Sequence, residues 1–199
     1  MATRRDDILD VAKEIFAERG VKATTVRQIG ARAGMVSGSL YHHFGSKLDM
    51  VDAILHELCD EILARYEEIA ASTDDAVERL RRFARYAFSL VADQRAALVV
   101  FYNEARYLVK DARFSYLNGF DRRIEDYWSD AIDAGVAQGR IRADIDTRLF
   151  YRVIRDTIAG AVDWYGPKDR PIEEVADTFI GILLYGILVH DGDRAVPKS

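Results

Sequence analysis

The chain has one cysteine, three prolines and no long apolar run, and each scarcity excludes a class of protein. A single cysteine among 199 residues cannot form an internal disulfide, which excludes a disulfide-stapled secreted domain. The longest apolar run, residues 179–189, has 11 residues, whereas a membrane-spanning helix needs ~20. The first residues carry charges where a secretion signal needs its apolar stretch. We therefore expect a cytoplasmic protein without a membrane segment.

Motifs typical of enzymes and metal proteins are also missing. The sequence has no glycine-rich phosphate loop, no zinc-ligand spacing and no nucleophile elbow. Cys59 lies within helical reach of His56 and Asp60, which suggests a helical thiol enzyme as one alternative. However, Cys59 falls beside the apolar stripe that includes Leu55 and Leu58, which favours a buried, inert cysteine. We expect no enzyme activity, no cofactor and no metal site.

Helical periodicity without strand alternation predicts an all-α fold. The prolines stand only at 167, 171 and 197, so few breakers interrupt the helices. A helix capped by Thr3 and Asp6 should end at Gly20, and a long helix should run from Ser46 to Ser72 without a break. Further helices are predicted at about 75–92, 94–110, 113–138, 147–165 and 172–191.

Residues 25–47 have the pattern of two short helices joined by a tight turn. Thr25, followed three residues later by Gln28, has the form of a capping box. Gly34 permits the reversal that ends this first helix, and Ser37 is a candidate N-cap for the second.

The second short helix is predicted to turn a polar face outward. Leu40 and Phe44 supply its inward face. They would pack with Phe16 and Ile29 at the centre of a three-helix domain. The outward positions are small, hydroxyl-bearing or aromatic: Gly38, Ser39, Tyr41 and His42. Two short helices with such an outer face fit a DNA-reading helix-turn-helix.

This stretch resembles the DNA-binding domain of the TetR family of bacterial transcriptional repressors. The likeness rests on ATTVRQIGARAG (23–34), LYHHF (40–44) and Ser46-Lys47, and extends over roughly residues 5 to 55. It implies a helix-turn-helix DNA-binding domain at 1–47 and a helical ligand-binding and dimerisation domain at 48–199. A weaker likeness, in RFSYL (113–117) and YRVIRDT (151–157), is to actinobacterial members that control steroid and fatty-acid breakdown and respond to acyl-CoA thioesters.

The predicted DNA contacts follow from side-chain chemistry. Arg27 suits a bidentate guanine contact, and Lys47 suits a phosphate at the positive end of the long helix. Arg4 and Arg5 are expected on a mobile N-terminal arm, where they contact DNA or are simply solvated. The complete predicted set is Arg4, Arg5, Thr25, Arg27, Ser37, Gly38, Ser39, Tyr41, His42, His43 and Lys47. Residues 1–50 carry eight Lys/Arg and six Asp/Glu, a net +2, while the remainder carries −7, so the charge permits DNA binding without requiring it.

Aromatic residues gather in the middle of the chain, where fifteen of the 21 lie between Phe83 and Tyr165. Most should fill a helical core, and some could wall a small-molecule site. The cationic face of Arg148, Arg152 and Arg155 is either a solvated surface or an anion site, and the weaker likeness implies a ligand contact at Arg155. The predicted ligand residues are Tyr102, Asn103, Arg106, Tyr107, Tyr127, Trp128, Arg152, Arg155 and Trp164.

The last predicted helix is apolar almost all round, so both of its sides need cover. A second subunit could cover one side, and a central core helix in a monomer is the alternative. The resemblance implies that the last two helices form a dimer interface. The predicted interface residues are Ile154, Ile158, Val162, Phe179, Leu183 and Ile187.

Together these features predict a homodimeric repressor that binds a palindromic operator and is released by a small molecule such as an acyl-CoA thioester. An activator, or a DNA-binding protein without a ligand, is the alternative. A helical enzyme built around Cys59 or the arginine face is a third hypothesis, for which no complete catalytic set is present.

Overall fold

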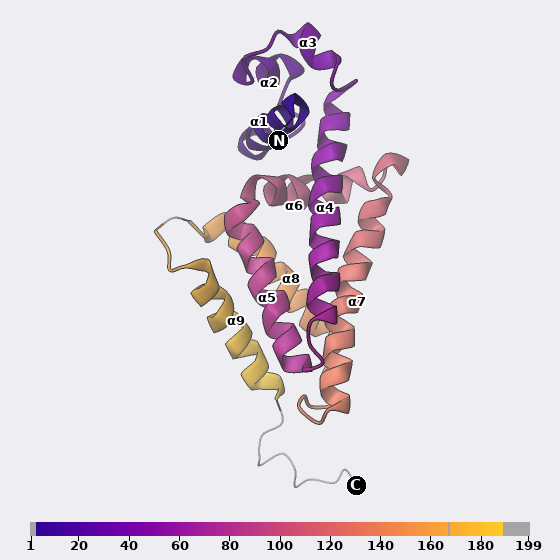
Figure 1. The fold of residues 1–199 in the computed structure, drawn as a ribbon, viewed down its shortest axis with the longest axis vertical. Helices are drawn as coiled ribbons and strands as arrows, with labels where there is room; N and C mark the ends of the chain where they lie inside the picture. Colours follow the sequence, from indigo (N-terminus) through magenta and orange to yellow (C-terminus); the bar gives the residue numbers. More distant parts are fainter. Residues whose placement is uncertain (1–2, 167, 189–199) are drawn as a thin grey trace. The chain divides into compact units, whose positions relative to one another are not determined.

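A computed structural model describes residues 3–166 and 168–188 of the chain. Within these residues the regular structure is helical, and an isolated β-bridge joins Ile141 to Leu188. The helices are α1 (Arg4–Arg19), α2 (Val26–Arg32), α3 (Ser37–Tyr41), α4 (Lys47–Ala71), α5 (Ala76–Asp93), α6 (Arg95–Leu108), the short 3-10 helix η1 (Ala112–Phe114), α7 (Tyr116–Ala137), α8 (Thr147–Trp164) and α9 (Ile172–Ile187), as Figure 1 shows. The predicted all-α fold is confirmed. None of these helices is both long enough and apolar enough to span a membrane.

The chain divides into two compact units. The first comprises Met1–Ile62 and Gln94–Phe120, and the second comprises Leu63–Asp93 and Asp121–Ser199. The first unit therefore extends beyond the predicted DNA-binding domain at 1–47, because it also includes the first part of α4 and all of α6.

Two capping boxes start α1 and α2, as predicted. The Thr3 hydroxyl accepts from the Asp6 amide at 3.3 Å, and the Asp6 carboxylate accepts from the Thr3 amide at 2.7 Å. Thr25 and Gln28 form the same reciprocal pair at the start of α2. Each box satisfies backbone donors that the first turn of a helix leaves without partners, so these short sequences determine where the helices begin.

The expected mobile arm at Arg4 and Arg5 is not present, because the cap at Thr3 places both residues in the first turn of α1. The Arg4 guanidinium donates to the Ala33 carbonyl at 3.1 Å. The Arg5 guanidinium lies 4.8 Å from the centre of the Phe44 ring, in a cation–π contact. Both arginines thus help to hold α1 against the α2–α3 region.

The start of α3 also differs from the prediction. Val36, rather than Ser37, is the N-cap residue, and its side chain makes no capping hydrogen bond. The Ser39 amide donates to the Val36 carbonyl at 3.0 Å, so the first turn closes one residue earlier than expected. The helix ends at Tyr41. The Phe44 amide still donates to the Leu40 carbonyl at 3.0 Å, and this turn carries the Phe44 ring into the core.

The core of the first unit contains the predicted residues, since Phe16, Ile29, Leu40 and Phe44 are all buried. Tight turns with positive φ at Gly20 and Gly34 end the first two helical segments, as expected. Helix α6 packs against α1 in the same unit.

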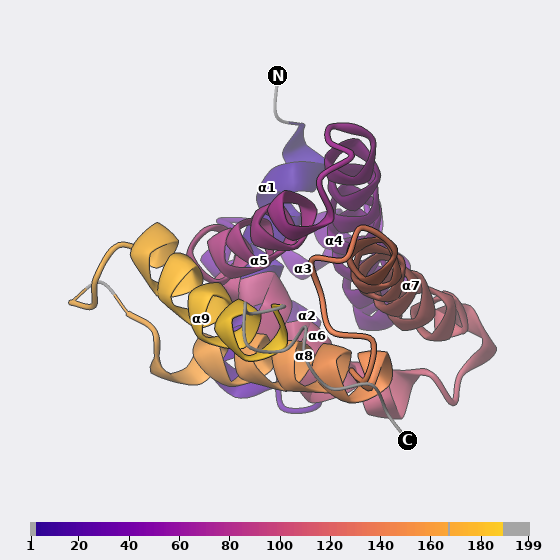
Figure 2. The same ribbon diagram turned by 90° about the horizontal axis from the view of Figure 1, so that it is seen from below.

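In the second unit, α5 lies beside both α8 and α9, as the two ribbon views show (Figures 1 and 2). Aromatic rings fill the interior of the second unit. The Phe83 ring stacks on Tyr66 with centroids 4.7 Å apart, and the Trp128 indole donates to the Tyr66 hydroxyl at 3.3 Å. The single helix predicted at 113–138 is in fact η1 followed by α7. Helix α9 ends at Ile187, and the remainder of the predicted helix, beyond residue 188, lies outside the described residues.

Candidate functional site

The outer surface of α3 is small, polar and accessible. The Leu40 side chain is fully buried, whereas Tyr41 is 55% exposed and His42 and His43 are both exposed. Gly38 is also exposed, and a Cβ added there would meet no other atom within 4 Å. A surface of this kind allows another molecule to approach the helix backbone closely and offers hydrogen-bond groups around it.

Two other residues of the predicted α3 contacts are placed differently. Ser39 is half-buried, so less of its hydroxyl is available than the helical spacing suggested. The side chain of Ser37 lies outside the described structure, and only its backbone position at the start of α3 is established.

Two arginines of α2 have contrasting surroundings. The Arg32 guanidinium binds the Glu18 carboxylate through two hydrogen bonds of 2.9 Å, which lowers the pKa of Glu18. Arg27 is exposed at the other end of the helix, and no hydrogen bond or ion pair of the described residues engages its guanidinium. Of the two, only Arg27 keeps its donor fork available for a guanine or a phosphate.

Thr25 and Lys47 have structural partners. The Thr25 hydroxyl is part of the capping box and also donates to the Gln28 side chain at 3.0 Å. The Lys47 ammonium donates to the backbone carbonyls of Val21 and, at 2.7 Å, Thr24. Lys47 therefore stabilises the loop between α1 and α2. A phosphate, as predicted, would have to compete with these carbonyls for the ammonium.

The first four predicted ligand residues lie on α6 in the first unit. Tyr102 is half-buried and packs edge-on against Phe101, with ring centroids 5.3 Å apart. Asn103 is exposed. The Arg106 guanidinium donates to the Tyr107 hydroxyl and lies 4.5 Å from the centre of that ring, on an exposed part of the helix.

The other predicted ligand residues lie in the second unit and differ widely in exposure. Trp128 is only 1% exposed and belongs to the aromatic core, and Tyr127 is half-buried beside it. Trp164 is 54% exposed at the end of α8, and Arg152 is exposed on the same helix.

Arg155 is held by acidic groups. Its guanidinium donates to Asp156 at 3.0 Å and lies 3.8 Å from the Asp121 carboxylate. The Tyr151 hydroxyl donates to the same carboxylate at 3.2 Å. Burial, with the nearby Asp121 charge, raises the pKa of Tyr151, so its hydroxyl stays protonated and remains a donor. An anionic ligand at Arg155 would replace one of these carboxylates.

Cys59 is buried, and burial raises the pKa of its thiol to about 12. A thiol that holds its proton so tightly is a poor nucleophile. Its neighbour His56 packs against Tyr116 instead, with the rings tilted and their centroids 3.8 Å apart, and its ring lies 3.2 Å from the Asp52 carboxylate. No group of three or more potential metal ligands occurs among residues 3–166 and 168–188.

Comparisons with known proteins agree with this geometry. The family model for bacterial regulatory proteins of the tetR family matches residues 8–54, and the model for a tetracyclin repressor-like C-terminal domain matches residues 73–187. The chain belongs to the TetR family. It is therefore a ligand-responsive, DNA-binding transcriptional regulator.

Individual relatives of this TetR-family chain match over nearly its whole length. The HTH-type transcriptional repressor KstR2 of Rhodococcus jostii (strain RHA1) is 40% identical over 185 residues, covering 92% of this chain and 91% of the relative. The solved structure of the ketosteroid transcriptional regulator KstR2 of Mycobacterium tuberculosis superimposes with a TM-score of 0.92 at 39% identity, covering 96% of this chain and 97% of that one. The fatty acid metabolism regulator protein of Bacillus subtilis (strain 168) is 28% identical over 189 residues, covering 90% of this chain and 93% of the relative.

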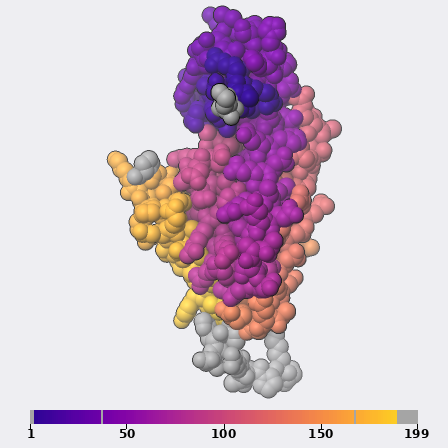
Figure 3. Space-filling model, in the orientation of Figure 1, coloured from indigo at the N-terminus to yellow at the C-terminus, as the bar shows by residue number. Residues whose placement is uncertain are grey.

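The predicted dimer residues of this TetR-family chain lie mostly on the inner faces of α8 and α9. Ile154, Ile158, Val162 and Ile187 are buried within the chain itself, and Phe179 and Leu183 are half-buried. The exposed apolar side chains of the same two helices are Leu149, Val153, Trp164, Ile182 and Tyr185. Much of the outer surface of α9 (gold) is uncovered in the space-filling view (Figure 3). A second chain would meet these side chains first.

One cavity was not expected from the sequence. It has a volume of about 410 Å³ and lies among α4, α5 and α9, and none of the nine predicted ligand residues lines it. Arginine-rich RLRRFAR (79–85) in α5 was the available signal, since it places Arg82 and Arg85 one turn apart.

Proposed function

We propose that this protein represses transcription by binding a palindromic operator as a homodimer, and that an anionic small molecule releases it. The observation that carries this proposal is the exposed outer face of α3, with Gly38, Tyr41 and His42 outward and Leu40 buried. Repression, rather than activation, is supported by the names of the relatives at 40% identity, which are repressors.

The proposed DNA contacts divide by role. Arg27 would read a base edge, since its guanidinium has no competing partner among the described residues. Tyr41, His42 and His43 would donate to phosphate oxygens, which fix the position of the helix on the duplex. Gly38 would let the α3 backbone approach the floor of the major groove.

The exposed apolar side chains of α8 and α9 support the homodimer. Ile182 is 69% exposed and Tyr185 is 75% exposed on α9, while Val153 and Leu149 are exposed on α8. Contact across a two-fold axis would remove these side chains from water. Full burial of an apolar side chain of this size stabilises the buried state by about 1.5–3 kcal/mol of free energy.

Footprinting of the full-length protein on selected DNA fragments tests the operator proposal. We expect two related protected half-sites with centres ~34 Å apart or a multiple of that distance, because two-fold symmetry presents two copies of α3 to one duplex. A single protected half-site, or protection with no symmetry, would contradict it. A reporter gene downstream of the fragment then distinguishes repression from activation.

For the effector, we propose an acyl-CoA thioester from steroid or fatty-acid breakdown, with an anionic group at Arg155. Support comes from the names of relatives that regulate ketosteroid or fatty-acid metabolism. Further support comes from the position of Arg155 beside Asp121, a carboxylate that a ligand phosphate can replace. The bound effector would favour a conformation with low operator affinity. The coupling free energy between effector binding and operator binding is typically 1–3 kcal/mol.

Gel-shift titrations with dodecanoyl-CoA and with a steroid-ring acyl-CoA test this proposal. We expect one of them to release the operator from the wild type and to fail with Arg155→Ala. Arg170→Ala, at an exposed position between α8 and α9 and outside the cationic face, is the control and should respond as the wild type does. Equal responses of both variants would remove Arg155 from the effector site.

A further inference from the structure

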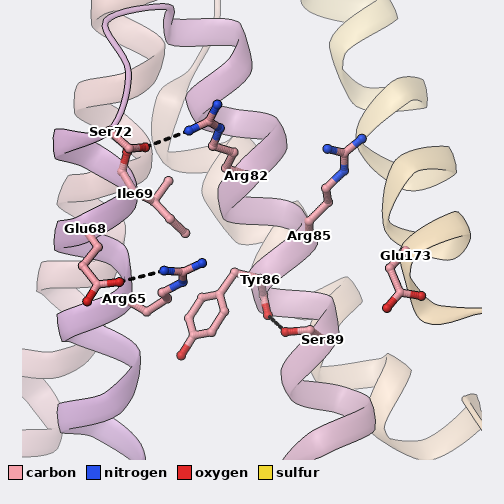
Figure 4. A pocket seen from close by; sticks show the side chains of 9 residues that line it. All are labelled: Arg65, Glu68, Ile69, Ser72, Arg82, Arg85, Tyr86, Ser89 and Glu173. Carbon is pink, nitrogen blue, oxygen red and sulfur yellow. Dashed lines mark hydrogen bonds and ion pairs between the residues drawn. The ribbon is translucent and has the colours of Figure 1, made fainter.

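A groove in the second unit is lined by three arginines. Arg65 comes from α4, Arg82 and Arg85 come from α5, and Glu173 comes from α9. The remaining lining residues are Glu68, Ile69, Ser72, Tyr86 and Ser89 (Figure 4). At about 410 Å³, the groove falls within the range that accommodates small molecules.

Each arginine is oriented by a carboxylate and still has donors to spare. Arg65 binds Glu68 at 2.7 Å, and Arg85 binds Asp177 at 2.6 and 3.1 Å. Arg82 binds Glu78 at 2.9 Å and the Ser72 hydroxyl at 3.0 Å. These bonds use five of the fifteen N–H groups that three guanidiniums carry. A guanidinium held in place loses less conformational entropy when it binds an anion than a free one does.

Carboxylates lie on both sides of the groove. In the close-up, Arg65, Arg82 and Ser72 lie on the side formed by α4 and the facing part of α5, together with Glu68, which pairs with Arg65 (Figure 4). Glu173 lies on the opposite side, on α9. A negative group is favoured where it reaches the remaining donors of Arg65 and Arg82, and it is disfavoured near Glu173.

Apolar side chains also line the groove. Ile69 is buried at the α4 wall, and the Tyr86 ring packs edge-on against Tyr66 at 5.9 Å, which fixes its orientation. A ligand with an apolar body could cover the Tyr86 ring while its charged end meets the guanidiniums.

We propose that this groove binds a small amphipathic anion, with its carboxylate or phosphate held between Arg65 and Arg82 and its apolar part on Tyr86 and Ile69. The groove is a site additional to the proposed effector contact, because Arg155 and the other predicted ligand residues do not line it. A bare inorganic anion lacks the apolar part and binds more weakly.

Isothermal titration of the full-length protein with dodecanoate, dodecanoyl-CoA and inorganic phosphate tests the proposal. We expect dodecanoate or dodecanoyl-CoA to bind the wild type, and the stronger of the two identifies carboxylate or phosphate as the anionic group. Arg65→Ala and Arg82→Ala should each weaken that binding about tenfold, because each removes a charge-assisted hydrogen-bond donor. Glu173→Gln should tighten it about twofold by removing a repelling charge.

Two further variants separate the site from general charge effects. Arg81→Ala removes the same charge from the same helix at a position that does not line the groove, and it should bind as the wild type does. Ser89→Trp fills the groove without changing its charge and should weaken binding at least tenfold. Melting temperatures near that of the wild type verify that each variant is folded.

Three results would overturn the proposal: no binding of any probe, equal weakening by Arg81→Ala and Arg82→Ala, or unchanged binding by Ser89→Trp. Operator gel shifts without probe keep the two proposals apart. If the wild type binds no operator fragment, the proposed function fails. If it binds the operator while the titrations show no probe binding, only the groove proposal fails.

Discussion

Two exposed surfaces of this protein carry tyrosines of similar accessibility in opposite surroundings. On α3, Tyr41 is 55% exposed beside Gly38 and the histidines 42 and 43. On α9, Tyr185 is 75% exposed, and Ile182, one turn earlier, is 69% exposed. The first surface offers several hydrogen-bond groups on a short helix that starts beside the exposed Val36. The second offers two large exposed apolar side chains on one face of its helix.

The contrast shows that exposure alone does not identify the partner of a surface. Polar groups around Tyr41 stay solvated in the free protein and can exchange water for phosphate and base edges. Apolar groups around Tyr185 gain from leaving water, so they favour another apolar surface, such as a second copy of the same helix.

The largest effect is expected from Ile182→Glu on α9. A carboxylate at this position would have to be buried unpaired in the proposed homodimer interface, so the dimer dissociation constant should rise at least ~100-fold. Analytical ultracentrifugation measures the change, and operator affinity should fall with it. Ala143→Glu, at an exposed loop position, is the control for the added charge and should remain dimeric. If Ile182→Glu also remains dimeric, α9 does not form the interface.

The next largest effect on operator affinity is expected at Arg27, with Arg32 as the comparison. Arg27→Ala should weaken operator binding by about 1–3 kcal/mol and relax the preference at one base position. Arg32→Ala removes a guanidinium that is already bound to Glu18, and it should leave operator affinity within about twofold. Gel-shift titrations on the operator and on single-base variants measure both. The reverse order of effects would show that α2 contacts DNA through its other end.

A smaller effect is expected from Lys47→Ala. Loss of its hydrogen bonds to Val21 and Thr24 should lower the free energy of unfolding by about 1–3 kcal/mol. If Lys47 only stabilises the α1–α2 loop, the slope of the logarithm of the operator-binding constant against the logarithm of the salt concentration stays unchanged. If it contacts a phosphate, as the sequence predicted, the slope decreases by about one. Urea unfolding measures the free energy of unfolding, and gel shifts at several salt concentrations measure the slope.

The smallest effect is expected at Cys59. Cys59→Ala should leave operator and effector binding unchanged, since the thiol takes part in no described hydrogen bond and is buried. Its raised pKa means that the thiol is protonated at all pH values well below about 12. Alkylation by iodoacetamide at pH 8 should therefore be at least ~100-fold slower in the folded protein than in urea. Rapid alkylation of the folded protein would restore the hypothesis of a reactive cysteine.

Local signals explain why much of the fold could be predicted from sequence. Thr3 with Asp6, and Thr25 with Gln28, determine helix starts within four residues of chain, and both capping boxes are confirmed. The uninterrupted helix predicted up to Ser72 is likewise confirmed as α4. Such features depend on neighbours in sequence, so periodicity and capping residues are sufficient to find them.

Features that depend on tertiary packing were harder to predict. The last helix is apolar almost all round, so its sequence does not show which side faces the core, and Ile154 and Ile187, predicted for the dimer interface, are buried within the chain. The groove near Arg82 is closed by α9, which is distant in sequence from α4 and α5, so the arginines of residues 79–85 do not by themselves indicate it. For Lys47, sequence correctly located the residue at a helix start, but the acceptors of its ammonium come from the α1–α2 loop, two helices earlier in the chain.

The central claim is that the outer face of α3 reads the operator, and a matched pair of tyrosine variants tests it most directly. Tyr41 and Tyr107 both lie in the first unit and are 55% and 54% exposed, so the same substitution removes the same exposed ring from each. In gel-shift titrations without effector, Tyr41→Ala should bind the operator about tenfold more weakly than the wild type. Tyr107→Ala should bind as the wild type does. Equal affinity of the two variants, with both folded and dimeric, would contradict the account.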